Sequence, residues 1–374
     1  MFRAVLLFSL FAAYAGAAEI DKAKLAGIDD AVKSALDKAE IPGAVVVVVH
    51  DDAVVFRKAY GSRAKKPTDE AMTLDTIFDL ASLTKPVATA TAIWKLIEDG
   101  KLKVIDKVSR HWPEFGAYDK GEVTVEHCLL HTSGLTADNA IADYKDGRAA
   151  ALKAIAGLKL EAPVGTRFKY SDVGFIVLGE IVERTAKMPL DEYAAKEIFK
   201  PLGMSDTSFK PGEKLKPRIA PTGLRDKAII RGDVHDPRAF AMGGIAGHAG
   251  LFGTADDLAI FARMLLNGGK GNAKAILKPQ TVKRLTEKVA LPKEGFRSRG
   301  WDVDTAFSSP RGSLFKPGEG YGHTGFTGTS IWIDPPSRIA IIILTNRVHP
   351  DDKGNATPLR RAIGSIVAEA LKEK

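Results

Sequence analysis

The chain has 374 residues, of which 45% are hydrophobic and 27% are charged, a composition typical of an ordinary soluble globular protein with one large or two modest domains. Apolar runs recur along its length without a long block of like charge, which excludes disorder for most of the chain. The formal net charge is +8, but the basic residues are scattered and not interleaved with aromatic residues, so nucleic-acid binding is not favoured.

The first twenty residues resemble an export signal. Arg3 precedes an apolar stretch that ends in small residues, and Ala15-Gly16-Ala17 forms an A-x-A-like cleavage site. We therefore expect a signal peptide over residues 1–17, the alternative being a buried N-terminal helix. No other stretch approaches about 20 apolar residues, so no membrane segment is expected after cleavage. The one cysteine, Cys128, is internal, which excludes an N-terminal lipid anchor and an intramolecular disulfide. The predicted location is the periplasm, in soluble form.

Strands are predicted near both ends of the chain and helices between them, from hydrophobic periodicity and turn residues. The predicted elements, in chain order, are a helix within 19–39, a buried strand at 45–49, its hairpin partner at 53–60, strands at 329–333 and 339–345, and a final helix with Leu359, Ile363, Ile366 and Ala370 on one face.

This order of elements predicts an α/β (α+β) fold, in which one antiparallel sheet is built from both ends of the chain and flanked by helices. Residues 18–80 and 285–374 would form the sheet domain. Residues 81–284 would form a mostly helical inserted domain.

Ser-x-x-Lys is the first motif that carries chemistry. On a helix its hydroxyl and amine share a face, so the amine can accept or relay the hydroxyl proton. The pattern occurs three times, at Ser62/Lys65, Ser82/Lys85 and Ser313/Lys316. The first copy lies in the turn-like string GSRAKKPTD, and the third lies in RGSLFKPGEG, where Pro317-Gly318 oppose a helix, so we predict both segments to be turns.

The second copy precedes a predicted helix. Apolar residues follow Ser82 at roughly helical spacing, Pro86 falls near the first turn, and Gly100 ends the run. A serine at a helix start lies beside unpaired N–H groups, which suit a developing oxyanion. The alternative is that Ser82 merely caps the helix, as serines often do.

Two further motifs favour the catalytic interpretation. Tyr170-Ser171-Asp172 precedes an apolar helix, and His323-Thr324-Gly325 precedes the penultimate predicted strand, where Gly325 would let a substrate approach the backbone closely. Either motif alone is more often structural, a capping turn in one case and a turn into a strand in the other. Their occurrence together and in this order points to function.

Together the motifs resemble the serine β-lactamase and penicillin-binding-protein-like superfamily, specifically its class C β-lactamase and D,D-peptidase branch. SLTK, YSD and HTG match that family's three motifs in order, over nearly the whole mature chain. Four neighbouring strings also resemble it: LLHTSGL (129–135), PVGTRFKYSDVGF (163–175), GHAGLFGTADDLA (247–259) and GHTGFTGTSIWIDP (322–335).

The resemblance implies a mechanism. Ser82 would attack a carbonyl carbon, Lys85 and Tyr170 would share the proton transfers, and the backbone N–H groups of Ser82 and Phe326 would form the oxyanion hole. The substrate-binding residues would be Asp172, His323, Thr324 and Gly325. No cofactor and no metal is implied.

Two positions depart from the family pattern. Asp172 stands where many members carry Asn, and a carboxylate close to Lys85 would favour the charged form of that lysine. Tyr170 then becomes the better candidate for the immediate base. His323 stands where class C β-lactamases usually carry Lys. Some D,D-carboxypeptidases have a His at this position, so the resemblance argues against a dedicated β-lactamase. A histidine there would also make substrate binding sensitive to pH near neutrality.

Other constellations carry less weight. His235, Asp236 and His248 lie among glycines without a metal-binding pattern, so a structural loop or the rim of a substrate site is favoured over a metal centre. Cys128, with His127 and His131 nearby, is expected to be a core residue and not half of a Cys–His dyad.

The leading hypothesis is an exported serine hydrolase that cleaves an amide or ester through an acyl-serine, most simply a D,D-carboxypeptidase-like enzyme on cell-wall peptides. A β-lactamase, a carboxylesterase and a muropeptide amidase would use the same residues. The alternative outside enzymes is a non-catalytic sensor that binds penicillin or peptidoglycan fragments. The sequence leaves the oligomeric state open.

Overall fold

The computed structural model describes residues 19–272, 274–313 and 318–371, so the predicted signal peptide lies outside the described residues. Within those ranges, no helix has both the length and the apolar character needed to cross a membrane.

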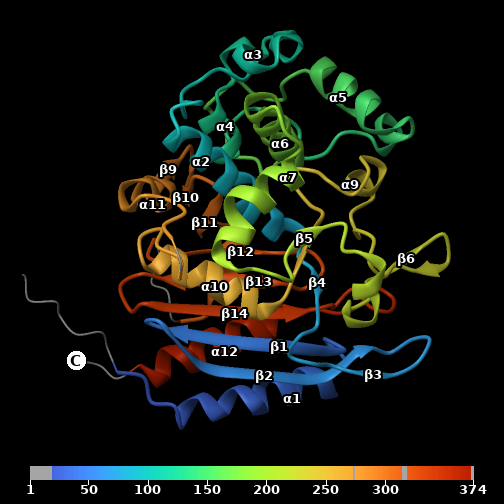
Figure 1. Cartoon of the computed structure of the whole chain (residues 1–374), viewed down its shortest axis with the longest axis vertical. Coiled ribbons are helices and arrows are strands. Elements are labelled where there is room, and N and C mark those ends of the chain that lie inside the picture. The colour runs from blue at the N-terminus through green and yellow to red at the C-terminus, as the bar shows by residue number, and fades with distance from the viewer. Residues whose placement is uncertain (1–18, 273, 314–317, 372–374) are drawn as a thin grey trace, which may run out of the picture.

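The fold centres on a nine-stranded sheet in which neighbouring strands are antiparallel (Figure 1). Its strands, from edge to edge, are β3 (Glu70–Ala71), β2 (Ala53–Ala64), β1 (Gly43–His50), β14 (Ile339–Thr345), β13 (Ser330–Asp334), β12 (Tyr321–Thr324), β11 (Trp301–Asp304), β10 (Glu294–Ser298) and β9 (Val289–Leu291). Because β1 pairs with β2 on one side and with β14 on the other, the predicted sheet made from both ends of the chain is confirmed.

Helices cover both faces of the sheet, which explains the unbroken apolar run in β1. Val46 and Val48 face a core formed with α1 (Gly27–Asp37) and α12 (Thr357–Ala370). Val45, Val47 and Val49 alternate with them and join the larger core on the opposite face, where α10 (Ala255–Leu266) packs. All eight residues of β1 are therefore buried.

Most other helices gather at the end of the molecule opposite α1, as Figure 1 shows for α3 to α6. The helices other than α1, α10 and α12 are α2 (Thr91–Glu98), α3 (Val108–His111), α4 (Val125–Leu129), α5 (Gly147–Gly157), α6 (Asp172–Ala186), α7 (Leu190–Ala194), α8 (Lys200–Leu202), α9 (Pro237–Ala241) and α11 (Pro279–Thr286), and α11 lies beside β9 and β10. Two small sheets join this region to the main one: β4 (Phe78–Asp79), β8 (Leu251–Gly253) and β5 (Ser208–Phe209), and the pair β6 (Leu224–Arg225) and β7 (Ala228–Ile229).

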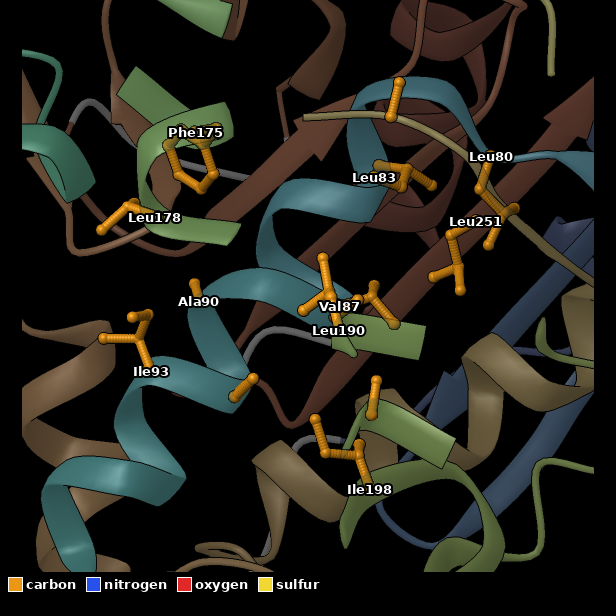
Figure 2. Packing of buried hydrophobic residues seen from close by; sticks show 14 of the residues in the cluster. Leu80, Leu83, Val87, Ala90, Ile93, Phe175, Leu178, Leu190, Ile198 and Leu251 are labelled. Atoms are coloured by element: carbon orange, nitrogen blue, oxygen red, sulfur yellow. The ribbon is translucent and has the colours of Figure 1, made fainter. Parts of the chain in front are cut away.

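The helix predicted after Ser82 is present, but in three parts. A 3-10 turn, η2 (Ala81–Leu83), leads into a π-helix, η3 (Lys85–Ala90), and then into α2. Pro86 lies in the first turn, as expected. Figure 2 shows Leu83, Val87 and Ile93 from this segment among buried side chains that include Phe175 and Leu178 of α6. The nucleophile candidate therefore stands on a fully packed support.

One prediction about the motifs' surroundings was wrong. Ser62 does not lie in a turn: β2 continues through it, because the strand pairs with β1 as far as Gly61 and then with β3 at Ser62. His323 precedes the penultimate strand, β13, as predicted, and it also lies within a strand of its own, β12, where it pairs with Ile331. In the third copy, Ser313 is exposed and Lys316 lies outside the described residues.

Candidate active site

Ser82 lies in a backbone turn that is tied down on both sides. The buried carboxylate of Asp79 accepts hydrogen bonds from the N–H groups of Ala81 (2.8 Å) and His235 (2.6 Å). Ala81 adopts a φ of 47°, a left-handed conformation that is unfavourable for a residue with a side chain. From the opposite side, Thr327 donates its hydroxyl to the Asp79 carbonyl oxygen at 2.7 Å. The turn is held in place by its neighbours and not by local preference.

Lys85 lies one helical turn after Ser82 and is fully buried. Its Nζ donates to Ser82 Oγ at 3.0 Å and to the carbonyl oxygen of His248 at 3.0 Å, and it lies 2.6 Å from Asp172 Oδ1. The first two contacts are hydrogen bonds, and the third is an ion pair between the ammonium and the carboxylate. The first residue of α6, Asp172, is thereby joined to the nucleophile turn.

The charge state of the site follows from these contacts. Burial by itself would lower the pKa of Lys85, but the nearby Asp172 carboxylate and Tyr170 outweigh burial, so its pKa is raised. Burial raises the pKa of Tyr170, and the positive charge of Lys85 offsets only part of that effect. At neutral pH the free protein therefore holds an ammonium at Lys85 and a phenol at Tyr170.

The end of β12 borders the turn on the side of the main sheet. His323 is buried and its Nδ1 lies 2.9 Å from the Thr324 carbonyl oxygen. Burial, together with the charges of Arg297 and Lys85, lowers the pKa of His323 well below its usual range. The expected pH sensitivity near neutrality is therefore corrected, because this imidazole stays neutral there.

Gly325 is needed for a different close approach from the one predicted. A Cβ atom at this position would lie 2.1 Å from Thr329 Oγ1 and 2.7 Å from the Leu80 carbonyl oxygen. The glycine thus allows the strand end to press against the Ser82 turn of the protein itself.

A cavity of about 190 Å³ opens beside Ser82, and it contains a residue that the sequence analysis did not single out. Arg297 of β10 lines this cavity, although it has no exposed surface. Its Nη1 donates to Asp302 Oδ1 at 3.2 Å, whereas Nε and Nη2 have no hydrogen-bond partner among the described residues. Buried donors are normally satisfied, so the two nitrogen atoms leave capacity for an acceptor. Other lining residues are Tyr170, Asp302, Phe307, His323, Thr324, Phe326 and Trp332.

A second cavity, of about 450 Å³, lies on the other side of Ser82. Ser82, Tyr170 and Phe326 line both cavities, so they form the boundary between them. The residues that belong to the second cavity alone include Asp138, Asp172, His235, Asp236, Arg238, His248 and Asp352. Ser82 is thus flanked by a small cavity with a buried cation and by a larger one lined with carboxylates.

Asp172, Asp236 and His248 bring potential metal-ligand atoms within 4.8 Å of one another. Lys85 already supplies a positive charge there, since its Nζ touches both the Asp172 carboxylate and the His248 carbonyl oxygen. His248 Nε2 in turn lies 3.0 Å from Asp236 Oδ1. The geometry is explained by Lys85 as the cation of the cluster.

Cys128 lies in the core within α4, as expected, and burial raises the pKa of its thiol to about 12. This thiol is therefore not a nucleophile at neutral pH.

Comparison with known protein families agrees with the arrangement of the three motifs around Ser82. A family model described as Beta-lactamase matches residues 28–365. The chain belongs to this family. The resemblance inferred from SLTK, YSD and HTG is thereby confirmed, and the protein is a serine hydrolase of the β-lactamase fold.

Proteins similar to this chain carry more than one activity in their names. A Salmonella agona (strain SL483) protein named "Putative D-alanyl-D-alanine carboxypeptidase" is 35% identical over 366 residues, which cover 88% of this chain and 84% of the relative. The structure of "EstCE1, a hydrolase with promiscuous acyltransferase activity" is similar with a TM-score of 0.74 at 24% identity, over 93% of this chain and 99% of that one. The structure of a penicillin-binding protein homologue from Caulobacter crescentus is similar with a TM-score of 0.75 at 21% identity, over 95% of this chain and 99% of that one. The two structures show the fold.

Proposed function

We propose that this chain is an exported D,D-carboxypeptidase-like enzyme, which removes the C-terminal residue of a cell-wall peptide through an acyl-Ser82 intermediate. The observation that carries the proposal is Arg297, a buried guanidinium with two unpartnered nitrogen atoms in the cavity beside Ser82. A carboxypeptidase must recognise the free carboxylate next to the bond that it cleaves. A guanidinium binds a carboxylate through paired, charge-assisted hydrogen bonds.

In this proposal the two cavities would each receive one half of the substrate. The cavity of about 190 Å³ around Arg297 would receive the small leaving residue, with Thr324 at its edge. The cavity of about 450 Å³ would receive the longer acyl portion of the peptide. The carbonyl carbon would then lie at Ser82, which lines both.

Acylation uses the groups around Ser82 Oγ. The reactive form is the minor one in which Tyr170 has lost its proton to solvent. The adjacent Lys85 ammonium favours this phenolate, although burial opposes it. The phenolate takes the Ser82 proton as Oγ bonds to the carbonyl carbon. The resulting phenol gives that proton to the leaving amine nitrogen as the C–N bond breaks. The backbone N–H groups of Ser82 and Phe326 would stabilise the oxyanion, each typically by about 3–4 kcal/mol.

Deacylation repeats the same steps with water. Tyr170, again a phenolate, takes a proton from the attacking water and returns it to Ser82 Oγ when the ester bond breaks. Asp172 keeps Lys85 charged through both halves of the cycle, because its carboxylate lies 2.6 Å from the ammonium. In this scheme the YSD motif would supply the proton-transfer group, Tyr170, and the SLTK motif the ammonium beside it, Lys85.

The experiment follows the purified protein and two serine variants with paired peptides that end in D-Ala-D-Ala, one with a free carboxylate and one amidated. We expect wild type and Ser62→Ala to release D-alanine and Ser82→Ala to release none. Ser62→Ala is the matched control, because Ser62 carries the same Ser-x-x-Lys motif within β2. The amidated peptide should react about 10- to 100-fold more slowly, and Arg297→Gln should abolish that difference.

Other outcomes would replace the proposal. Turnover of simple esters without peptide cleavage would make the chain a carboxylesterase. Rapid loss of a penicillin without a lasting adduct, again without peptide cleavage, would make it a β-lactamase. Release of a whole peptide from a muropeptide would indicate an amidase. A stable one-to-one acyl adduct with every substrate would indicate a sensor.

A further inference from the structure

His131 holds three consecutive residues of the Tyr170 segment, although it comes from a different part of the chain. It follows α4, and its carbonyl oxygen accepts the N–H of Lys169 at 2.9 Å. Its ring Nδ1 accepts the N–H of Ser171 at 3.0 Å. Between these two contacts its ring stacks on that of Tyr170, with centroids 4.5 Å apart and planes inclined by 29°. One residue thus fixes the backbone on both sides of Tyr170 and the ring itself.

The contact with Ser171 defines the protonation of His131. Because Nδ1 accepts a backbone N–H, the ring is assigned as the neutral tautomer with its proton on Nε2. The ring is buried, and the charged or titratable groups that act on it are Arg297, Lys85 and His323. Burial and these neighbours lower the pKa of His131 well below its usual range, so the acceptor persists at neutral pH.

The backbone of His131 is also unusual. Its φ is 59°, in the left-handed region that residues with side chains seldom adopt. This conformation lets the carbonyl oxygen and the ring Nδ1 of one residue reach N–H groups on either side of Tyr170. Such a conformation persists only where surrounding contacts determine it, which the three contacts with the Tyr170 segment do.

We infer that His131 is a positioning residue for the proton-transfer group Tyr170, which it holds against Ser82 and Lys85 without touching the reacting atoms. The inference rests on the proposed role of Tyr170 in acylating Ser82. It does not depend on which acyl donor is the natural one. The other rings near Tyr170 are Phe307 and His323, at 5.2 Å and 6.0 Å between centroids. His131 adds to its ring contact the two backbone contacts that determine where residue 170 lies.

Two substitutions separate the contacts. His131→Asn keeps an acceptor near the position of Nδ1 and tolerates a positive φ, but lacks the ring. His131→Phe keeps a ring and leaves the Ser171 N–H without its acceptor. We expect the Phe variant to lower the rate constant for acylation of Ser82 about 10- to 100-fold, with the affinity of the preceding complex within about twofold, since a small misplacement of a catalytic group is costly. The Asn variant should restore the rate to within about fivefold of wild type.

The matched control is His127→Phe. His127 lies four residues earlier, in α4, and its Nδ1 accepts the N–H of Thr124 in the cap of that helix. Replacing His127 by Phe should lower the melting temperature, because the cap of α4 loses this acceptor, and leave the acylation rate per folded molecule unchanged. Rates are measured in single turnover with a chromogenic cephalosporin or an activated ester, alongside thermal unfolding of each variant.

The inference is overturned if His131→Phe behaves as His127→Phe does, with reduced stability and an unchanged acylation rate. If the Phe variant does not fold, His131→Gly replaces it, since glycine accepts the positive φ but offers neither acceptor nor ring. A Gly variant as fast as the Asn variant would also overturn the inference. Failure of the carboxypeptidase proposal leaves this test intact, because any donor that acylates Ser82 reports the rate.

Discussion

Lys85 and Lys120 are both buried lysines with similar apolar surroundings. Neither has exposed surface, and each Nζ lies over two aromatic rings and donates to backbone carbonyl oxygen. The ring distances are 5.1 Å to Tyr170 and 5.8 Å to Phe175 for Lys85, and 5.4 Å to Phe115 and 5.2 Å to Tyr118 for Lys120.

Their charge environments differ. Lys85 has the Asp172 carboxylate at 2.6 Å, whereas Lys120 is held by the carbonyl oxygens of Ala117 and Leu158. Burial lowers the pKa of Lys120, but the pKa of Lys85 is raised despite burial. Burial alone therefore does not make a lysine a base. The carboxylate keeps the catalytic candidate charged, while carbonyl groups suffice for a lysine that fills space.

The largest expected effect comes from replacing each lysine by methionine. Lys85→Met should lower acylation of Ser82 about 100- to 10,000-fold, the usual range for general acid–base catalysis, because Tyr170 loses the ammonium that favours its phenolate. Lys120→Met should leave acylation per folded molecule unchanged. It should lower the free energy of unfolding by about 1–3 kcal/mol, because two buried carbonyl groups lose their donor. Single-turnover rates and urea unfolding measure both. An equal loss of rate in the two variants would break the comparison.

The next effect concerns the partner of Lys85. Asp172→Asn removes the charge that raises the pKa of this lysine, so burial is less opposed and the pKa falls. If acylation needs the ammonium, the alkaline limb of its pH–rate profile moves to lower pH. Asp119→Asn is the control, because Asp119 acts in the same way on Lys120. The pH–rate profile of Asp119→Asn should coincide with that of wild type. An alkaline limb that does not move in Asp172→Asn would contradict the role of the Lys85 ammonium in acylation.

The smallest effect tests a third buried charge, Asp79, which is held by two N–H groups and no cation within hydrogen-bond reach among the described residues. Burial raises its pKa from 3.8 to about 6. The folded state then binds the proton more tightly than the unfolded chain, so the stability contribution is present below pH 4 and is lost as pH rises toward 6, by roughly 3 kcal/mol.

Urea unfolding between pH 4 and 7 measures this dependence. The difference in unfolding free energy between wild type and Asp79→Asn should change across that interval, since the variant cannot titrate there. Parallel curves would show that Asp79 is ionised throughout.

Local sequence signals predicted the parts of the site that lie on regular elements. The apolar spacing after Ser82 predicted the helix, and the run of valines predicted β1, because burial imposes a period on the sequence. Ser62 was placed wrongly because a glycine within a long strand resembles a turn. The separate strand that contains His323 was not predicted, because a strand of only four residues carries little periodic signal.

The residues that were missed act through contacts that no local pattern records. Arg297 is a single arginine on a short strand, and its importance comes from burial beside Ser82 with unpaired nitrogen atoms. His131 was considered only beside Cys128, its neighbour in sequence. Its actual partner, Tyr170, is brought to it by the packing of α4 on α6. Nothing in the spacing of these residues distinguishes them from ordinary core residues.

The order of strands in the sheet makes the position of Ser82 depend on the far end of the chain. Ser82, Lys85 and Tyr170 all come from the first half of the chain, but the Ser82 turn is held by Thr327 and Thr329, and β1 pairs with β14 near the end of the chain. Contacts between such distant segments form late in folding. A folding chain in which these later segments have not yet docked therefore lacks the support of the Ser82 turn, and the site is assembled only when the last strands pair.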